Sequence, residues 1–170
     1  MRWGKLVFVV LFVLVIPVFL VASNVRWVIS TPLLYNYGFD RYDIPDRTGI
    51  ERSELRRVGF EIREYFDNSE EFLNVRVSQQ GIIRNLYNDR EILHMRDVKS
   101  LVRGVFIFHT SSAAFIISFI LVGFWLHRTK FVPYLSRYVS LGGILCVLLV
   151  VCVGLASLCL LYTSDAADDT

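Results

Sequence analysis

The sequence predicts an all-α membrane protein with three transmembrane helices and a mainly helical domain outside the cytoplasm, between the first and second helices. Of the 170 residues, 54% are hydrophobic, and the mean hydropathy is +0.48, which is more apolar than most soluble domains. Nearly all charges lie in residues 26–103, in residues 127–137 and at the two ends, which leaves three long uncharged stretches. Because a charge at mid-bilayer costs roughly 3 kcal/mol, this segregation is what a spanning chain requires.

The three uncharged stretches place the expected spans at residues 6–25, 104–126 and 139–161. About 20 helical residues cross a hydrocarbon core of roughly 30 Å. The first stretch could instead be a cleaved signal peptide, because Arg2 and Lys5 precede it and residues 21–23 resemble a cleavage site. Its apolar run is longer than the roughly 7–15 residues of a signal peptide, which favours an uncleaved anchor.

Basic residues at the ends of these stretches predict the orientation. Arg2 and Lys5 lie in residues 1–5, and the loop 127–138 carries Arg128, Lys130 and Arg137 without an acidic residue. Short basic flanks face the cytoplasm, so residues 1–5 and 127–138 are expected there. Residues 26–103 would then form the domain outside the cytoplasm.

The composition excludes several other classes of protein. The net charge is +2, and the sequence has no basic patch with interleaved aromatic residues. Nucleic acid is therefore not an expected partner. The three cysteines all fall in the third apolar stretch, where their spacing matches neither a zinc site nor a disulfide framework. We therefore expect these cysteines to pack as small apolar side chains within a span.

The last nine residues differ abruptly from the rest. Residues 162–170 are polar and acidic, directly after the third apolar stretch. We expect this tail to be artefactual and the natural protein to be longer. A genuine acidic tail is the alternative.

The first part of the outer domain predicts one amphipathic helix. An aromatic-rich irregular stretch, residues 31–46, suits the membrane surface. Thr48 and Glu51 have the spacing of a capping box, and apolar residues recur every three or four positions to Phe66. The alternating piece 75–77 could be a strand but is expected to belong to a loop, and Gly81 predicts a turn.

A second, longer helix is expected to run from the outer domain into the membrane. Asn88 is a suitable N-cap with Glu91 three residues later. No proline follows before the end of the second apolar stretch, so one helix is predicted from Asp89 to Leu126. Its first four turns would stand outside the membrane and pack against the helix that ends at Phe66.

Glu91, His94 and Asp97 form a polar ridge on this helix, because they recur every three residues. A histidine between two acids has the raised pKa and the fixed orientation that a general base needs. His94 lies nine residues before Arg103, which is about 14 Å on an upright helix, at or just above the level of lipid esters. The alternative is a solvated helix face with weak ion pairing.

A metal site would need a second Glu-x-x-His pair, which the sequence lacks, so no metal is expected.

The segment Leu86–Leu101 resembles a bacterial family of integral membrane proteins long catalogued as a domain of unknown function. One branch contains the lipoprotein intramolecular transacylases, called Lit. The most recognisable part is Glu-x-x-His-Met-x-Asp-Val-Lys, which runs from Glu91 to Lys99. Further matching residues are Tyr35, Phe39, Asp40, Tyr42, Asp43, Thr48, Gly49, Tyr65 and Phe66. The resemblance extends over about residues 6–161.

This resemblance implies a four-span protein of the cell membrane with both ends in the cytoplasm. It implies a second outer segment with a Phe-His motif before a fourth span, whereas this chain stops after its third apolar stretch. In Lit, an acyl chain of a diacylated lipoprotein moves from the glyceryl ester to the amino group of the N-terminal cysteine. No cofactor is required by this chemistry.

The resemblance also suggests roles for individual residues. His94 would be the base, with Glu91 and Asp97 as orienting groups, and Tyr87, Lys99 or Tyr35 could bind the substrate by donating to the oxyanion. The expected partners are the lipid bilayer and a diacylated lipoprotein. The competing hypothesis is a non-catalytic membrane protein whose outer domain binds an envelope partner.

Overall fold

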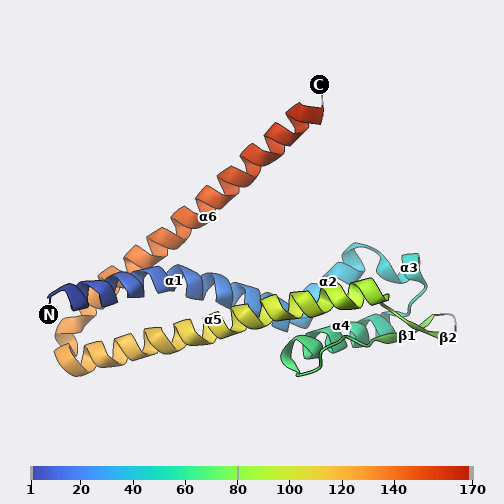
Figure 1. The fold of residues 1–170 in the computed structure, drawn as a ribbon, viewed down its shortest axis with the longest axis horizontal. Coiled ribbons are helices and arrows are strands. Elements are labelled where there is room, and N and C mark those ends of the chain that lie inside the picture. The colour runs from blue at the N-terminus through green and yellow to red at the C-terminus, as the bar shows by residue number, and fades with distance from the viewer. Residues whose placement is uncertain (1, 80, 169–170) are drawn as a thin grey trace. The chain divides into compact units, whose positions relative to one another are not determined.

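The computed structural model describes residues 2–79 and 81–168, and most of them are helical (Figure 1). The chain divides into an apolar unit, Met1–Val21 with His109–Thr170, and a polar unit, Ala22–Phe108. The elements in chain order are α1 Arg2–Ser30, α2 Pro32–Arg41, α3 Ile44–Thr48, α4 Arg52–Asp67, β1 Arg76–Gln79, β2 Ile82–Asn85, α5 Asp89–His127, η1 Arg128–Phe131 and α6 Val132–Asp168.

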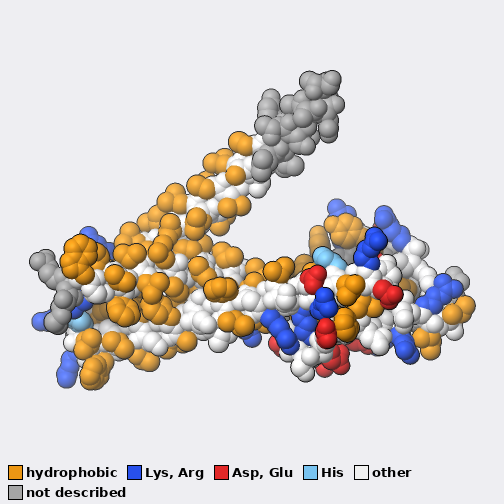
Figure 2. Space-filling model, in the orientation of Figure 1, with side chains coloured by type: hydrophobic (Ala, Val, Ile, Leu, Met, Phe, Trp, Pro, Cys, Tyr) orange, Lys and Arg blue, Asp and Glu red, His pale blue; other side chains and the backbone are white. Residues whose placement is uncertain are grey.

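Two stretches of helix among the described residues are long and apolar enough to cross a membrane. They are Trp3–Ser30, with 28 residues, and Asp89–Cys159, with 71 residues. Hydrophobic side chains cover most of the visible face of α1 and α6, whereas acidic side chains gather over the polar unit (Figure 2). These stretches indicate association with a membrane. The division of the longer stretch into two spans at η1 stays a prediction.

Aromatic packing holds the apolar unit together. The Phe12 ring is fully buried and stacks on Phe119 with 4.1 Å between the ring centroids. Phe131 of η1 is also buried and lies 6.0 Å from the Phe119 ring. A Cβ atom at Gly123 would collide with the Phe131 ring, so only glycine lets the turn close this tightly on α5.

The core of the polar unit lies between α4, α5 and the segment that joins them. One face of α4 supplies Leu55, Val58, Tyr65 and Phe66. Leu73, Val75 and Val77 follow from the connecting segment, and Val102 comes from α5. The expected packing of α5 on the helix that ends near Phe66 is therefore confirmed.

The expectation that residues 75–77 belong to a loop is wrong. Arg76–Gln79 pairs antiparallel with Ile82–Asn85, and Gly81 takes φ +80° in the turn between them, as the sequence predicted. Val75 and Val77 are both buried in the core, and the Leu86 amide donates to the Val75 carbonyl at 2.9 Å. Burial of the valines and this backbone bond stabilise the hairpin, so the mainly helical domain contains a two-stranded sheet.

The predicted capping box at Thr48 is also wrong, because α4 begins at Arg52 instead. Thr48 ends the short helix α3, where its hydroxyl donates to the Ile44 carbonyl at 2.7 Å. Gly49 follows with φ 68°, and the Gln79 side-chain amide donates to the Thr48 carbonyl. These contacts hold Thr48 in a helix C-terminus, so its side chain cannot cap α4.

The second predicted capping box, at the start of α5, is confirmed. The Asn88 amide donates to the Glu91 carboxylate at 2.8 Å, and the Glu91 amide donates to the Asn88 side-chain oxygen at 3.0 Å. Two backbone donors at the helix start are thereby satisfied reciprocally. The predicted helix Asp89–Leu126 is found as Asp89–His127.

Loss of this cap is expected to loosen the first turns of α5. Asn88→Ala should lower the free energy of unfolding by about 1 kcal/mol, because the Glu91 amide loses its acceptor. Hydrogen exchange of the first-turn amides and chemical denaturation in detergent measure the effect. Asn88→Asp keeps a good N-cap and should stay close to the unchanged protein. Equal stability of the alanine and aspartate variants would contradict a role for this cap.

Candidate functional site

His94 lies on the second turn of α5 with its side chain exposed. Within the part of the chain that the structure describes, its imidazole has no hydrogen bond, ion pair or ring contact. The capping box at Asn88 fixes the helix only six residues earlier. His94 is therefore an unengaged, solvent-exposed imidazole near the capped start of α5.

The two acids of the ridge are engaged elsewhere. The Glu91 carboxylate accepts from the Asn88 amide, as described above. The Asp97 carboxylate is 3.7 Å from the Arg96 guanidinium, and its side chain is 73% exposed. The structure thus places both acids on the same helix as His94, but neither of them hydrogen-bonds its imidazole.

Tyr35 and Tyr87 lie close to one another in the polar unit, and both are half-buried. Burial raises the pKa of the Tyr87 hydroxyl, and negative charge on Glu91 and Tyr35 raises it further. Burial also raises the pKa of Tyr35, against a smaller opposite effect of Arg63. Both hydroxyls are therefore protonated at neutral pH and can donate, and Tyr35 donates to the Ile29 carbonyl at 3.4 Å.

Lys99 is placed differently from the other candidates, because it is buried, with only 4% of its surface exposed. Its ammonium donates to the Asn68 side-chain oxygen at 2.8 Å and to the Glu70 carbonyl at 2.6 Å. It also lies 3.9 Å from the centroid of the Tyr65 ring. Burial lowers the pKa of Lys99, and the positive charge of Arg103 adds to that effect.

The structure does not bring Lys99 together with His94. Five residues along an α-helix turn a side chain by about 140°, so Lys99 faces the core while His94 faces solvent. Tyr65 and Lys99 both belong to the segments that resemble the family. Their distance along the chain, however, gave no sign that the two side chains would be in contact.

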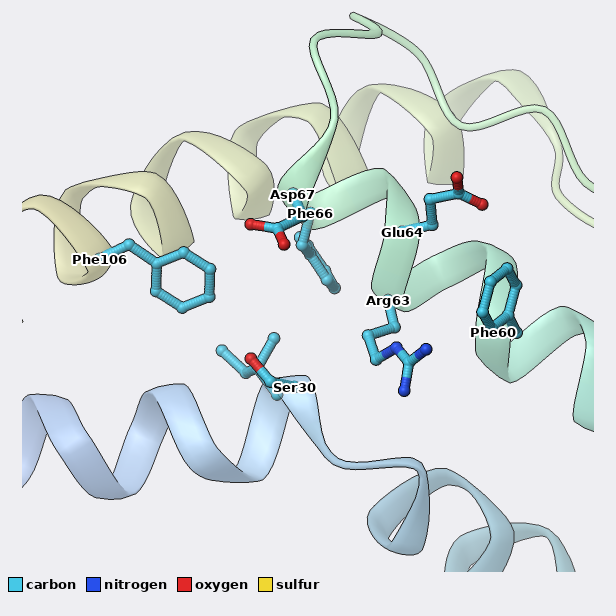
Figure 3. A pocket seen from close by; sticks show the side chains of 8 residues that line it. Ser30, Phe60, Arg63, Glu64, Phe66, Asp67 and Phe106 are labelled. Atoms are coloured by element: carbon cyan, nitrogen blue, oxygen red, sulfur yellow. The ribbon is translucent and has the colours of Figure 1, made fainter.

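The polar unit also contains a pocket of about 310 Å³ that sequence reasoning missed (Figure 3). Its apolar wall includes Phe66 of α4 and Phe106 of α5, and the Arg63 and Asp67 side chains of α4 also line it. Figure 3 shows Arg63 extending toward Phe60 and Asp67 lying beside Phe66. In the sequence, the sign of this pocket was the spacing of Arg63 and Asp67, whose four-residue separation places them on one face of a helix.

This pocket lies at the edge of the apolar stretches. The Arg26 guanidinium, which follows the apolar part of α1, lies 4.7 Å from the centroid of the Phe106 ring near the start of the apolar part of α5. The end of the apolar part of α1 and the start of the apolar part of α5 therefore lie next to each other. Phe106 follows His94 by twelve residues, so the pocket and His94 are about 18 Å apart along α5. The structure does not join them in one site.

Comparison with known proteins gives one positive finding. No curated protein and no solved structure matches the chain. The family profile described as "Lipoprotein intramolecular transacylase Lit" matches residues 10–162, which include α2–α5 and the His94 ridge. The chain therefore belongs to the lipoprotein intramolecular transacylase family.

Proposed function

We propose that this protein is a membrane-embedded transacylase that acts on diacylated lipoproteins. It would move one acyl chain from the glyceryl ester of the lipoprotein to the amino group of its N-terminal cysteine, leaving a lyso-lipoprotein. The observation that carries the proposal is the exposed, unengaged imidazole of His94 near the start of α5. Membership of the family supports a lipoprotein as the substrate.

The proposed reaction needs one base and one donor. The cysteine ammonium first loses a proton through His94 to solvent, and the resulting amine attacks the ester carbonyl while His94 takes the second proton from its nitrogen. The new C–N bond forms, the ester C–O bond breaks through a tetrahedral oxyanion, and the imidazolium returns its proton to the departing glyceryl oxygen. Tyr87 or Tyr35 would donate to the oxyanion, and their raised pKa values support this because both remain protonated.

Glu91 and Asp97 are proposed as orienting groups whose contribution is indirect. Glu91 secures the start of α5 through its bond to the Asn88 amide. Asp97 is exposed and lies about 60° around the helix from His94, so rotation of its side chain could bring it to the imidazole. The carboxylate would then stabilise the imidazolium that forms when the amine loses its proton.

The proposed topology places His94 outside the cytoplasm. Residues 6–25, 104–126 and 139–161 would span the membrane, with the N-terminus and residues 127–138 in the cytoplasm. The Arg26–Phe106 contact supports a common outer boundary for the first two spans. From this boundary an upright α5 would raise His94 about 18 Å, so the helix must tilt or the substrate ester must rise from the headgroup layer.

The test is production of the protein in a bacterium whose own lipoproteins are diacylated and which lacks such an enzyme. Mass spectrometry of a lipoprotein N-terminus should show a lyso form with one ester-linked chain and one amide-linked chain. A host without the gene serves as the control. If the N-terminal amine stays free although the protein is present in the membrane, the proposal fails.

A non-catalytic binding function is the second candidate. It is favoured by the apolar surface of α2, where Leu33, Leu34 and Tyr37 are at least half exposed, and by exposed Ile82 and Ile83 on the hairpin. A photo-crosslinker at position 37 should capture one envelope protein if this function is correct. Capture of lipid alone, together with lyso-lipoprotein formation, would favour the enzyme.

A further inference from the structure

The turn that joins α5 to α6 carries a second hollow, which belongs entirely to the apolar unit. Its volume is about 780 Å³, and Lys130, Tyr134, Arg137 and Ser140 are among the residues that line it. Arg137 precedes the apolar run of α6 by two residues, whereas Lys130 follows that of α5 by four. The hollow therefore lies where both apolar stretches end, at the level of lipid headgroups if these stretches span the membrane.

This turn has a defined shape. Buried Phe131 packs against Gly123 and lies 5.5 Å from the Phe124 ring. Arg128 takes φ 51°, which lets the chain reverse within the four residues of η1. Lys130 is the immediate neighbour of Phe131, so the backbone that carries its ammonium is fixed by the packed ring.

The polar residues of the hollow share one face of α6. Pro133 is three and four residues before Ser136 and Arg137, and Ser140 is four and three residues after them, which brings the four to one side of the helix. Ser136, Arg137 and Ser140 all line the hollow, and the two serine hydroxyls can donate hydrogen bonds. The hollow thus combines two cations with several hydroxyl donors, which is the donor set that a phosphate group accepts.

The charge around the hollow is of one sign. No Asp or Glu occurs between Asp97 and Asp165 in the sequence. Among the residues that the structure describes, neither Lys130 nor Arg137 has an acidic partner within ion-pairing distance, and both side chains are exposed. A zwitterionic headgroup would bring an ammonium group that finds no carboxylate here, whereas an anionic headgroup brings only negative charge to the two cations.

We propose that this hollow binds the phosphate of an anionic phospholipid, such as phosphatidylglycerol, in the adjoining leaflet. Lys130 and Arg137 hold the phosphate, and the Ser136 and Ser140 hydroxyls donate to its oxygens. Basic pockets beside spanning helices recognise anionic headgroups in this manner. The inference uses the proposed membrane topology but is independent of acyl transfer, because none of these residues belongs to the polar unit that carries His94.

Native mass spectrometry of the detergent-solubilised protein tests this binding site. Titration with phosphatidylglycerol should give one tightly retained lipid, with clear preference over phosphatidylcholine of the same chain length. Lys130→Gln combined with Arg137→Gln should weaken retention about 30-fold, as the loss of two headgroup contacts predicts. Lys5→Gln combined with Arg128→Gln removes the same charge from the apolar unit outside the hollow, and should change retention less than threefold.

Three results would overturn the proposal. Equal retention of phosphatidylcholine would show that the hollow does not select an anionic lipid. Equal losses in both double variants would show diffuse attraction by net charge. Displacement of the lipid by glycerol phosphate at matched concentration would show a site for free phosphate esters. The proposed function is judged separately, because the Lys130/Arg137 variant should still yield lyso-lipoprotein.

Discussion

His94→Ala is expected to lower the rate of lyso-lipoprotein formation about 10²- to 10⁴-fold. This is the usual contribution of a positioned general base, and without it the cysteine ammonium has no acceptor for its proton at the site. The described residues near the start of α5 supply no other histidine, so a neighbouring imidazole cannot replace it. The measurement is the initial rate of N-acylation of a lipoprotein by mass spectrometry, at equal amounts of membrane-inserted protein.

Matched variants on the same helix separate catalysis from folding. Arg90→Ala alters an exposed residue of α5 one turn before His94 and should leave the rate unchanged. Glu91→Gln keeps an acceptor for the Asn88 amide, so it should preserve the helix start and cost much less than loss of His94. Asp97→Asn should give an intermediate loss if Asp97 orients the imidazolium. Full activity of a folded His94→Ala protein would remove His94 from the mechanism.

Lys99→Met is expected to lower the free energy of unfolding by about 3 kcal/mol, because it removes two hydrogen bonds made by a buried ammonium. Methionine fills a similar volume but cannot donate to the Asn68 side chain or the Glu70 carbonyl. It also removes the ammonium from the face of the Tyr65 ring. These contacts hold the end of α4 and the following segment against α5, so chemical denaturation of the purified protein should show the loss directly.

The exposed neighbour Arg96 provides the control for Lys99. Its guanidinium lies 3.5 Å from the Glu71 carboxylate at the surface, and such pairs contribute less than about 1 kcal/mol. Arg96→Met should therefore change stability little. The same pair of variants separates the two roles of Lys99. A stable Lys99→Met protein with a strongly reduced transacylation rate would restore Lys99 to the substrate site.

Several features could be read directly from the sequence, because their interactions join residues close along the chain. The segregation of charge predicted the apolar helices, and the spacing of Asn88 and Glu91 predicted the start of α5. Gly81 predicted its turn, since only a residue without Cβ accepts φ +80° at no cost. The ridge from Glu91 to Asp97 was likewise visible as a three-residue repeat.

Only the tertiary structure decided which local patterns were used and which side chains were exposed. Thr48 and Glu51 have the same spacing as Asn88 and Glu91, but the contact from Gln79, 31 residues away, fixes Thr48 in a different helix end. Lys99 and His94 both looked like candidates for the site, but Lys99 is buried and bonded to Asn68, 31 residues away, whereas His94 is exposed. Contacts of this kind depend on how the whole unit folds, because burial and distant hydrogen bonds outweigh local preferences of about 1 kcal/mol. The sequence alone therefore determined the long apolar helices and the ridge, whereas the stretch expected to be irregular, residues 31–46, is mostly helical as α2 and α3. Packing decided that His94 faces solvent while Lys99 holds the core.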